Sequence, residues 1–396
     1  MTMRLYDTAN KDVIDLNLNQ RVKMYVCGIT PYDSTHLGHA ATYLTYDLII
    51  RRLEDIGHEV ELVRNYTDVD DSILPKAREL GIDFLELAEM EMNRFKDDMG
   101  ALNTVDPAHE PRATESIEAM LRLIKKLQSA GHTYEVEGTT YFDVSTFPEY
   151  GKLSGYTSEE MISLARERGG NPDSENQRNP LDFVLWQPSA EAEPKWESVF
   201  GAGRPGWHIE CSAMSMEALG ETIDIHGGGG DLIFPHHECE IAQSESITGQ
   251  LCSKYWVHAG LVAYQGTKMS KSLGNLVFVS ELRKEIDPRA IRLALMRHHY
   301  RQDFEWFDEE GTAAQVDLES LISACGDAEP VWSGNLISQV RQFLDDDLDA
   351  PAVRAIMLRE ASGKGDVPGV LRAGELRAAG LLCGLNLNGS RSILPH

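Results

Sequence analysis

Two apolar runs with an amphipathic stretch between them dominate the pattern near the start of the chain. Residues 22–26 form an apolar-rich run typical of a buried strand, and residues 60–65 form a second one. Residues 36–56 show helical spacing, and Gly57 follows where glycine commonly ends a helix. A strand, a helix and a strand in this order predict a βαβ unit with parallel strands and a right-handed crossover.

The middle of the chain changes pattern several times. Residues 79–130 are mostly helical, and residues 133–185 hold short strand-like pieces and loops. Residues 223–226 predict a further strand, and residues 227–230 a glycine loop. Pro235 is predicted to begin another helix, because proline is tolerated at the first helical position.

These patterns divide the chain into parts. After Lys284 the chain is predominantly helical. We therefore predict an α/β protein whose parallel-sheet core lies at residues 1–96 and 201–284. An insertion is predicted at residues 97–200, and a helical domain at residues 285–396.

The charge of the chain bears on its partners. The net charge is −26, with 63 acidic against 37 basic residues. A surface that holds nucleic acid should carry a basic stripe, so this balance favours a small substrate over a large RNA or DNA footprint. A local basic groove within an acidic protein stays open as an alternative.

Location and cysteine usage follow from composition. No apolar run approaches the roughly 20 residues that span a bilayer, and the first residues show no apolar signal region. A cytoplasmic protein without a membrane partner is therefore expected, and a monomer is predicted. The six cysteines are then expected to be reduced, so metal binding or catalysis is the question for those near histidines or carboxylates.

Two short strings point to nucleotide chemistry. HLGH at residues 36–39 follows the first strand and opens a helix, and KMSKS at residues 268–272 lies in a loop after another apolar run. Helix N-termini and histidines can bind phosphates, and lysines on a mobile loop can close over a leaving pyrophosphate. Each string alone is also compatible with a solvated surface turn. Together they predict ATP binding and adenylate formation, in which a carboxylate attacks the α-phosphate.

A possible metal site is spread over the sheet core. Cys27 ends the first strand, Cys211 lies where the core resumes, and His236 and Glu240 share a helix face at i and i+4. Two thiolates, an imidazole and a carboxylate suit tetrahedral zinc. The alternative is that these are separate buried or capping residues. Cys239 is a rival ligand, although it should point elsewhere on the helix.

Several longer strings resemble the cysteinyl-tRNA synthetase family, a class I aminoacyl-tRNA synthetase group. They are YVCG at 25–28, HLGH at 36–39, NYTDVDD at 65–71, GRPGWHIECSAMS at 203–215, DIHGGG at 224–229, FPHHE at 234–238 and KMSKSLGN at 268–275. The resemblance covers residues 4–355. It implies a Rossmann-like catalytic domain with a connective insertion, followed by a C-terminal helical domain.

The resemblance also implies roles for individual residues. Zn²⁺ would be bound by Cys27, Cys211, His236 and Glu240, and would hold the sulfur of substrate cysteine. Catalytic roles with ATP and Mg²⁺ fall on His36, His39, Lys268 and Lys271. Further ATP contacts fall on Gly38, Gly229, Met269 and Ser270. The residues implied for cysteine binding are Gly28, Thr30, Thr67, Trp207 and Asp231.

The family has a second branch, the ligases of mycothiol biosynthesis, which join cysteine to the amine of glucosaminyl-inositol. Residues 27–45 and the string RERGGNPD at 166–173 resemble that branch. In the tRNA enzymes an arginine usually stands where Ala41 is. Glu240 departs from the pattern, because the mycothiol branch usually lacks this carboxylate.

We therefore predict an ATP-dependent cysteine ligase that forms cysteinyl-adenylate and transfers cysteine to an amino sugar, glucosaminyl-inositol. The acidic charge and the short helical C-terminus favour this acceptor. The alternative is a short cysteinyl-tRNA synthetase that transfers cysteine to tRNA. A third hypothesis, a non-catalytic relative that binds cysteine, zinc or a protein, is disfavoured because both phosphate-binding strings are intact.

Overall fold

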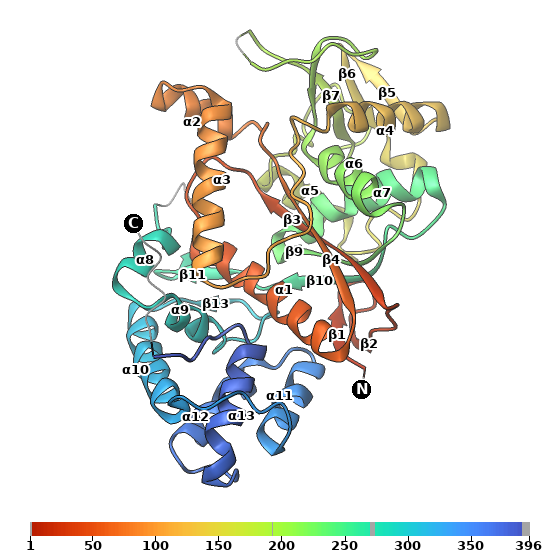
Figure 1. Ribbon diagram of the computed structural model, residues 1–396. Coiled ribbons are helices and arrows are strands. Elements are labelled where there is room, and N and C mark those ends of the chain that lie inside the picture. The colour runs from red at the N-terminus through yellow and green to blue at the C-terminus, as the bar shows by residue number, and fades with distance from the viewer. Residues whose placement is uncertain (1, 192, 270–273, 390–396) are drawn as a thin grey trace.

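The computed structural model describes residues 2–191, 193–269 and 274–389, and its centre is a parallel sheet (Figure 1). The strand order is β10 (Ser253–Ala259), β9 (Ile223–Gly229), β3 (Arg21–Ile29) and β4 (Glu59–Tyr66). The pairings in this sheet are all parallel, which confirms the predicted α/β class. The carboxyl ends of these strands therefore meet at one edge, where open α/β sheets bind ligands.

Helix α1 (Leu37–Ile56) connects β3 to β4, as the βαβ prediction requires. Its apolar side chains recur at helical spacing, and Leu44, Ile49 and Leu53 are buried in the main core. The helix ends at Gly57, whose φ of 111° is in the left-handed region that glycine adopts without strain. The amide of Gly57 donates to the carbonyl of Leu53. The predicted helix and its end are confirmed.

The chain between β4 and β9 adds helices and an antiparallel sheet (Figure 1). The helices are α2 (Ile73–Leu80), α3 (Phe84–Ala101), α4 (Ile117–Ala130), α5 (Ser158–Glu167) and α6 (Trp207–Leu219). The strands are β5 (Thr133–Val136), β6 (Thr139–Phe142), β7 (Phe183–Pro188) and β8 (Gly203–Pro205). Helices α2 and α3 share the main core with α1, whereas α4, α6 and the antiparallel sheet pack in a second core. The boundaries at residues 96 and 200 stay a prediction; α3 runs across the first, and β8 lies just beyond the second.

One expectation near residue 230 needs correction. The glycines at 227–229 are the last residues of strand β9, so the predicted glycine loop is shorter than expected. The π-helical turn Ile233–His237 leads directly into helix α7 (Glu238–Thr248), and within that turn Phe234 has non-helical backbone angles; the Phe234–Pro235 bond is cis. Helical backbone angles therefore begin at Pro235, as the sequence predicts, because proline is tolerated at the first helical position after an extended residue.

The last part of the described chain is mainly helical, as predicted. Its elements are β11 (Val262–Tyr264), β12 (Thr267–Lys268), α8 (Val279–Glu285), α9 (Pro288–Leu295), β13 (Phe304–Glu305), α10 (Asp308–Cys325), α11 (Asn335–Asp345), α12 (Ala350–Ala361) and α13 (Gly369–Leu382). These helices share one hydrophobic core with α1. Buried ion pairs, including Arg52 with Asp345 at 2.8 Å, join α1 to α11.

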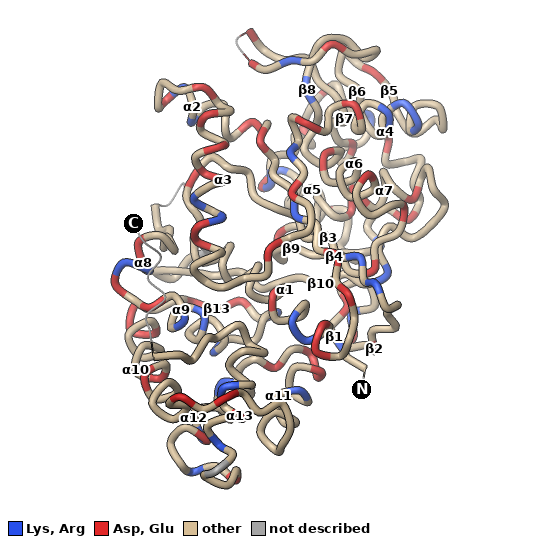
Figure 2. The backbone as a smooth tube through the Cα atoms, viewed as in Figure 1, with Lys and Arg blue, Asp and Glu red and all other residues tan. Residues whose placement is uncertain are grey.

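A hairpin at the N-terminus borders the parallel sheet. Strands β1 (Arg4–Asp7) and β2 (Asp12–Asp15) pair antiparallel, and β1 packs beside β10. In Figure 2, acidic residues lie along α10, and elsewhere acidic and basic residues are mixed. Among the described residues, no helix combines the length and the apolar character needed to cross a membrane.

Candidate active site

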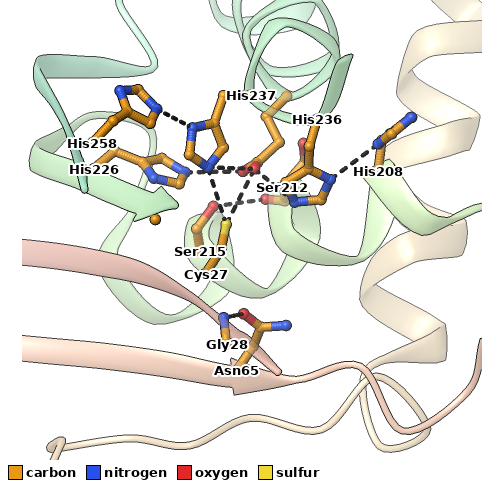
Figure 3. Close-up of polar contacts among 12 residues, drawn as sticks. Cys27, Gly28, Asn65, His208, Ser212, Ser215, His226, His236, His237 and His258 are labelled. Carbon is orange, nitrogen blue, oxygen red and sulfur yellow. Dashed lines mark hydrogen bonds and ion pairs between the residues drawn. The ribbon is translucent and has the colours of Figure 1, made fainter. Parts of the chain in front are cut away.

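The carboxyl end of β3 supplies the first residues of the site. Cys27 is buried there, and the amide of Gly28 donates to Oδ1 of Asn65 at 2.8 Å (Figure 3). A Cβ atom at Gly28 would stand 1.5 Å from the carbonyl oxygen of Asn65, so only glycine fits between the two strands. The predicted cysteine-binding residue Gly28 thus has a structural reason to be glycine.

The first turn of α1 presents both histidines of the HLGH string. The imidazoles of His36 and His39 stack with their ring centres 3.7 Å apart. His36 precedes the helix with extended backbone angles, so its ring and the amides of the first turn are on the same end of α1. The N-terminal end of the helix carries positive partial charge, which favours phosphate groups.

Backbone hydrogen bonds bring the segments that flank the KMSKS string to the start of α1. The amide of Leu37 donates to the carbonyl of Val277 at 2.8 Å, and the amide of Val279 donates to Thr35 at 3.0 Å. On the other side, the amide of Met269 donates to Val262 at 3.1 Å. Ser270 and Lys271 lie outside the described residues, and the structure describes the backbone of Lys268 but not its side chain.

Asn275 fastens the base of this loop. Its amide nitrogen donates to the carbonyl of Tyr264 and to Oγ1 of Thr267, both at 3.0 Å. The sequence predicted no role for Asn275 beyond its place at the end of the KMSKSLGN string. No sequence signal marks it as an anchor, because its partners lie in a preceding segment and meet it only in the fold.

One cleft of about 490 Å³ joins these segments, and we call it the activation cleft. This volume lies in the range of small-molecule sites. The predicted site residues that line it are Cys27, Gly28, His36, Gly38, His39, Gly229, Asp231 and Met269. Its walls also include Tyr32, Thr42, Tyr43, Leu261 and Leu276, which sequence reasoning did not select.

Four predicted metal ligands come together behind the cleft. One donor atom from each of Cys27, Cys211, His236 and Glu240 lies within 4.8 Å of the others, and all four residues are buried. We call these residues the ligand cluster. Nε2 of His236 lies 3.1 Å from Oε1 of Glu240. Two thiols, an imidazole and a carboxylate in this space match the donor set of a four-coordinate metal site.

The protonation of the ligand cluster is unusual. A hydrogen bond with Cys27 lowers the pKa of Cys211 to about 6, while burial raises the pKa of Cys27 well above its usual value. Although burial alone would lower it, the negative charges of Cys211 and Glu240 raise the pKa of His236 to about 10. The cluster therefore concentrates negative charge in a buried position, which suits a bound cation.

Further imidazoles surround the cluster (Figure 3). His226 places Nε2 3.0 Å from Oε2 of Glu240, and His208 places Nδ1 3.0 Å from Nδ1 of His236. Such contacts orient ligands and tune their basicity. His226 and His237 also form an alternative set of possible ligands with Cys27 and Glu240. Sequence reasoning selected neither His226 nor His237, because spacing alone does not show that β9 and the segment before α7 bring both side chains to the ligand cluster.

The remaining predicted cysteine-binding residues differ in whether they line the activation cleft. The indole of Trp207 stacks on the imidazole of His236, with ring centres 4.4 Å apart. Thr67 is buried and accepts from the side chain of Asn65 at 3.3 Å. Thr30 is half-buried after β3. Among the described residues that line the activation cleft, Thr30, Thr67 and Trp207 are absent, whereas Asp231 is present.

An arginine from the insertion fixes the segment between Asp231 and the ligand cluster. Nη1 of Arg168 donates to the carbonyl oxygens of Asp231 at 2.6 Å and of Phe234 at 2.5 Å. The carboxylate of Glu238 also accepts from the amide of Ser154 at 3.0 Å. The insertion thus holds residues 231–238 at two places. Arg168 belongs to the RERGGNPD string, but no role was predicted for it.

Comparisons with known proteins agree with this architecture. The chain matches the family model described as tRNA synthetases class I (C) catalytic domain over residues 14–316. It is 46% identical over 376 residues to the L-cysteine:1D-myo-inositol 2-amino-2-deoxy-alpha-D-glucopyranoside ligase of Thermobispora bispora. This match covers 94% of this chain and 93% of that protein. The protein of the same name from Streptosporangium roseum is 47% identical, and the match covers 93% of this chain and 91% of that protein.

A solved structure supports the fold. Methionyl-tRNA synthetase from Mycobacterium tuberculosis, in complex with methionyl-adenylate, superposes with a TM-score of 0.62 at 19% identity. The match covers 93% of this chain and 88% of the other. The family resemblance stated from the sequence is confirmed. The chain belongs to the family of class I (C) tRNA synthetase catalytic domains, in the group that contains the L-cysteine:1D-myo-inositol 2-amino-2-deoxy-alpha-D-glucopyranoside ligases.

Proposed function

We propose that this protein is an ATP-dependent ligase that activates cysteine as cysteinyl-adenylate and transfers it to the amine of 1D-myo-inositol 2-amino-2-deoxy-α-D-glucopyranoside, the glucosaminyl-inositol of mycothiol biosynthesis. The relatives that share 42–48% of its sequence carry this name. One structural observation supports the cysteine half: Cys27 belongs both to the ligand cluster and to the wall of the activation cleft. A substrate sulfur bound at the cluster would therefore have its carboxylate in the cleft.

The nucleotide end of the cleft performs activation. The amides at the start of α1 and the imidazoles of His36 and His39 bind phosphate oxygens of ATP, which enters with Mg²⁺. Gly38 and Gly229 let the nucleotide approach the backbone closely, and Met269 adds an apolar wall. Lys268, Ser270 and Lys271 are assigned to the pyrophosphate, where lysines stabilise the charge that develops as it leaves.

The sulfur end of the cleft selects the amino acid. Cys27, Cys211, His236 and Glu240 would hold zinc, and when bound the zinc prefers a thiolate and lowers the pKa of a substrate thiol. Trp207 fixes the ring plane of His236 by stacking. Gly28, Thr30, Thr67 and Asp231 are assigned to the rest of substrate cysteine. Serine offers no thiolate, so it is rejected at this end.

The second half-reaction forms an amide. The neutral amine of the sugar attacks the carbonyl carbon of cysteinyl-adenylate and forms the C–N bond. The bond from that carbon to the phosphate oxygen breaks, its electron pair leaves with AMP, and the nitrogen releases one proton to solvent. The acidic balance of the chain, 63 acidic to 37 basic residues, favours a small amine over a polyanionic acceptor.

A short cysteinyl-tRNA synthetase is the second candidate. It is favoured by Glu240, whose carboxylate lies in the ligand cluster as the resemblance to the tRNA enzymes implies. Both candidates share the activation step. They differ only in the acceptor that enters after cysteinyl-adenylate has formed.

The acceptor can be tested by measuring AMP release with ATP and cysteine, in the presence of either glucosaminyl-inositol or bulk tRNA. We expect stimulation by the amino sugar, with formation of its cysteinyl amide. Stimulation by tRNA alone, with cysteine esterified to it, would replace the proposed acceptor with tRNA. Cysteine-dependent ATP–pyrophosphate exchange, measured without an acceptor, is the control that the first half-reaction is intact.

A further inference from the structure

A second cavity lies at the same edge of the parallel sheet, beyond the edge strand β10. Its volume is about 360 Å³, within the range of small-molecule sites. The N-terminal hairpin, the end of β10 and the insertion each contribute to its walls, through residues that include Thr8, His258 and Tyr156. None of these residues has a role in the activation of cysteine as proposed above.

The second cavity adjoins the activation cleft. Gly260 and Leu261 line both spaces, and Gly230 of the cavity directly follows Gly229 of the cleft. Of the two residues that line both spaces, Gly260 has no side chain, so Leu261 contributes the side chain at this boundary. A ligand in the cavity can extend one end across this boundary towards the carbonyl of an adenylate in the cleft.

A line of hydrogen bonds also runs from the cavity to the ligand cluster. Oγ1 of Thr8 lies 2.7 Å from Nδ1 of His258, and Nε2 of His258 lies 2.7 Å from Nδ1 of His237. Nε2 of His237 in turn lies 3.3 Å from Sγ of Cys27. Because each bond fixes the next ring, the cavity wall and the sulfur end of the cleft hold one fixed relative position.

The lining of the cavity suits a polyhydroxylated ligand. Asp303 accepts from the amide of Leu261 at 2.7 Å through Oδ1, and its second oxygen has no hydrogen bond or ion pair within the described part of the chain. Lys11 likewise has no side-chain partner among residues 2–191, 193–269 and 274–389. A carboxylate and an ammonium offer both an acceptor and donors to hydroxyl groups. The half-exposed ring of Tyr156 offers an apolar face.

A phosphate-bearing ligand fits the lining less well. Arg301 contributes a second cation, but its Nε is engaged by Asp347 at 2.6 Å and its guanidinium lies 5.2 Å from the ring centre of Tyr6. Lys11 would attract a phosphate, but the carboxylate of Asp303 would repel it in the same space. The free acceptor oxygen of Asp303 instead matches the hydroxyl groups of an amino sugar.

The geometry points to this second cavity as the binding site of the acceptor, an amino sugar joined to a cyclitol, with its amine directed across Gly230 and Gly260 into the activation cleft. This inference rests on the proposed function. Asp303 and Tyr156 are the residues through which the cavity would bind the polyol, and Thr8 and His258 form its inner wall. We call the cavity the acceptor cavity from here on.

The test compares Asp303→Asn and Tyr156→Ala with the unaltered protein. Asparagine keeps an oxygen that can accept from Leu261, whereas the charge and the second acceptor oxygen are lost. We expect each change to raise the KM for glucosaminyl-inositol about tenfold, the effect of one lost contact to a charged group or ring. The KM values for ATP and cysteine in ATP–pyrophosphate exchange should stay unchanged, which also shows that each variant is folded.

Matched controls separate the cavity from general surface effects. Asp327→Asn removes an exposed carboxylate after α10 and should change neither KM. Tyr156→Phe keeps the ring and should restore most of the affinity that Tyr156→Ala loses. If unaltered protein responds to the amino sugar but Asp303→Asn and Tyr156→Ala leave its KM unchanged, the acceptor cavity is refuted while the proposed function stands. If the unaltered protein does not respond to the amino sugar, both the proposed function and the cavity assignment fall.

Discussion

The two ends of the activation cleft are built differently. At the sulfur end, Cys27, Cys211, His236 and Glu240 are at most 5% exposed and are enclosed by further imidazoles. At the phosphate end, His36 and His39 are only half-buried. Residues of both ends line the same cleft. The side chains of the sulfur end are buried, whereas the histidines of the phosphate end are partly exposed to solvent.

This difference matches the chemistry of the two substrates. Selection of a thiol over a hydroxyl needs donors held in one geometry, because small displacements weaken a metal–ligand bond. Pyrophosphate must leave after every turnover, so the groups that stabilise it need to open and close. Changes at the sulfur end should therefore affect metal content and cysteine binding together, whereas changes at the phosphate end should affect the rate of activation alone.

The largest effect is expected from Cys211→Ser. Loss of a thiolate ligand should remove zinc from the isolated protein and raise the cysteine KM strongly, because disturbing a neighbour of a ligand alone lowers metal affinity about 10–100-fold. Metal analysis and ATP–pyrophosphate exchange would measure both results. Cys252→Ser is the control, since that thiol is buried in a different cluster. Full zinc and activity in the Cys211 variant would refute the ligand assignment and favour the set with His226 and His237.

The next largest effect concerns the opposite end of the cleft. Changing Lys268 and Lys271 together to alanine should lower kcat for cysteine activation about 10²-fold or more, the scale of a lost transition-state donor. Zinc content should not change. Lys284→Ala, which removes an exposed lysine from α8, serves as the control. A near-normal rate of ATP–pyrophosphate exchange in the double variant would remove these lysines from the proposed mechanism.

A smaller effect should follow from His226→Gln. His226 contacts Glu240 at 3.0 Å without belonging to the predicted ligand set, so its loss should lower zinc affinity about 10–100-fold and leave some metal bound. Competition with a chelator would measure this affinity. A greater loss of zinc than in Cys211→Ser would reverse the order and make His226 a ligand rather than a neighbour.

The smallest effect is expected from Arg168→Gln. The two hydrogen bonds from Arg168 to the carbonyls of Asp231 and Phe234 hold the segment that leads to His236. Their loss should raise the cysteine KM about tenfold, with little change in the KM for ATP. Arg166→Gln is a matched control at the end of α5, two residues before Arg168, because Arg166 pairs with exposed Asp173. Equal increases in both KM values would show that Arg168 supports the whole fold and not the sulfur end.

Much of this organisation was predictable from local sequence. The strand at residues 22–26, the helix at residues 36–56 and the end at Gly57 follow from apolar spacing and from the conformational freedom of glycine. The helical start at Pro235 was also predicted, whereas the π-helical form of this first turn, which α7 continues from Glu238, was not. Local pattern does not distinguish a π-helical turn from an α-helical one.

The sequence by itself determined the parallel α/β core, the family and the four residues of the ligand cluster, because strings of fixed residue type carry those signals. Only the tertiary structure decided that Cys27 faces both the cluster and the cleft, that Arg168 reaches the segment before His236, and that a second cavity adjoins the cleft at Gly230 and Gly260. These contacts join residues far apart along the chain. Their positions depend on how whole elements pack, which periodicity and spacing do not encode.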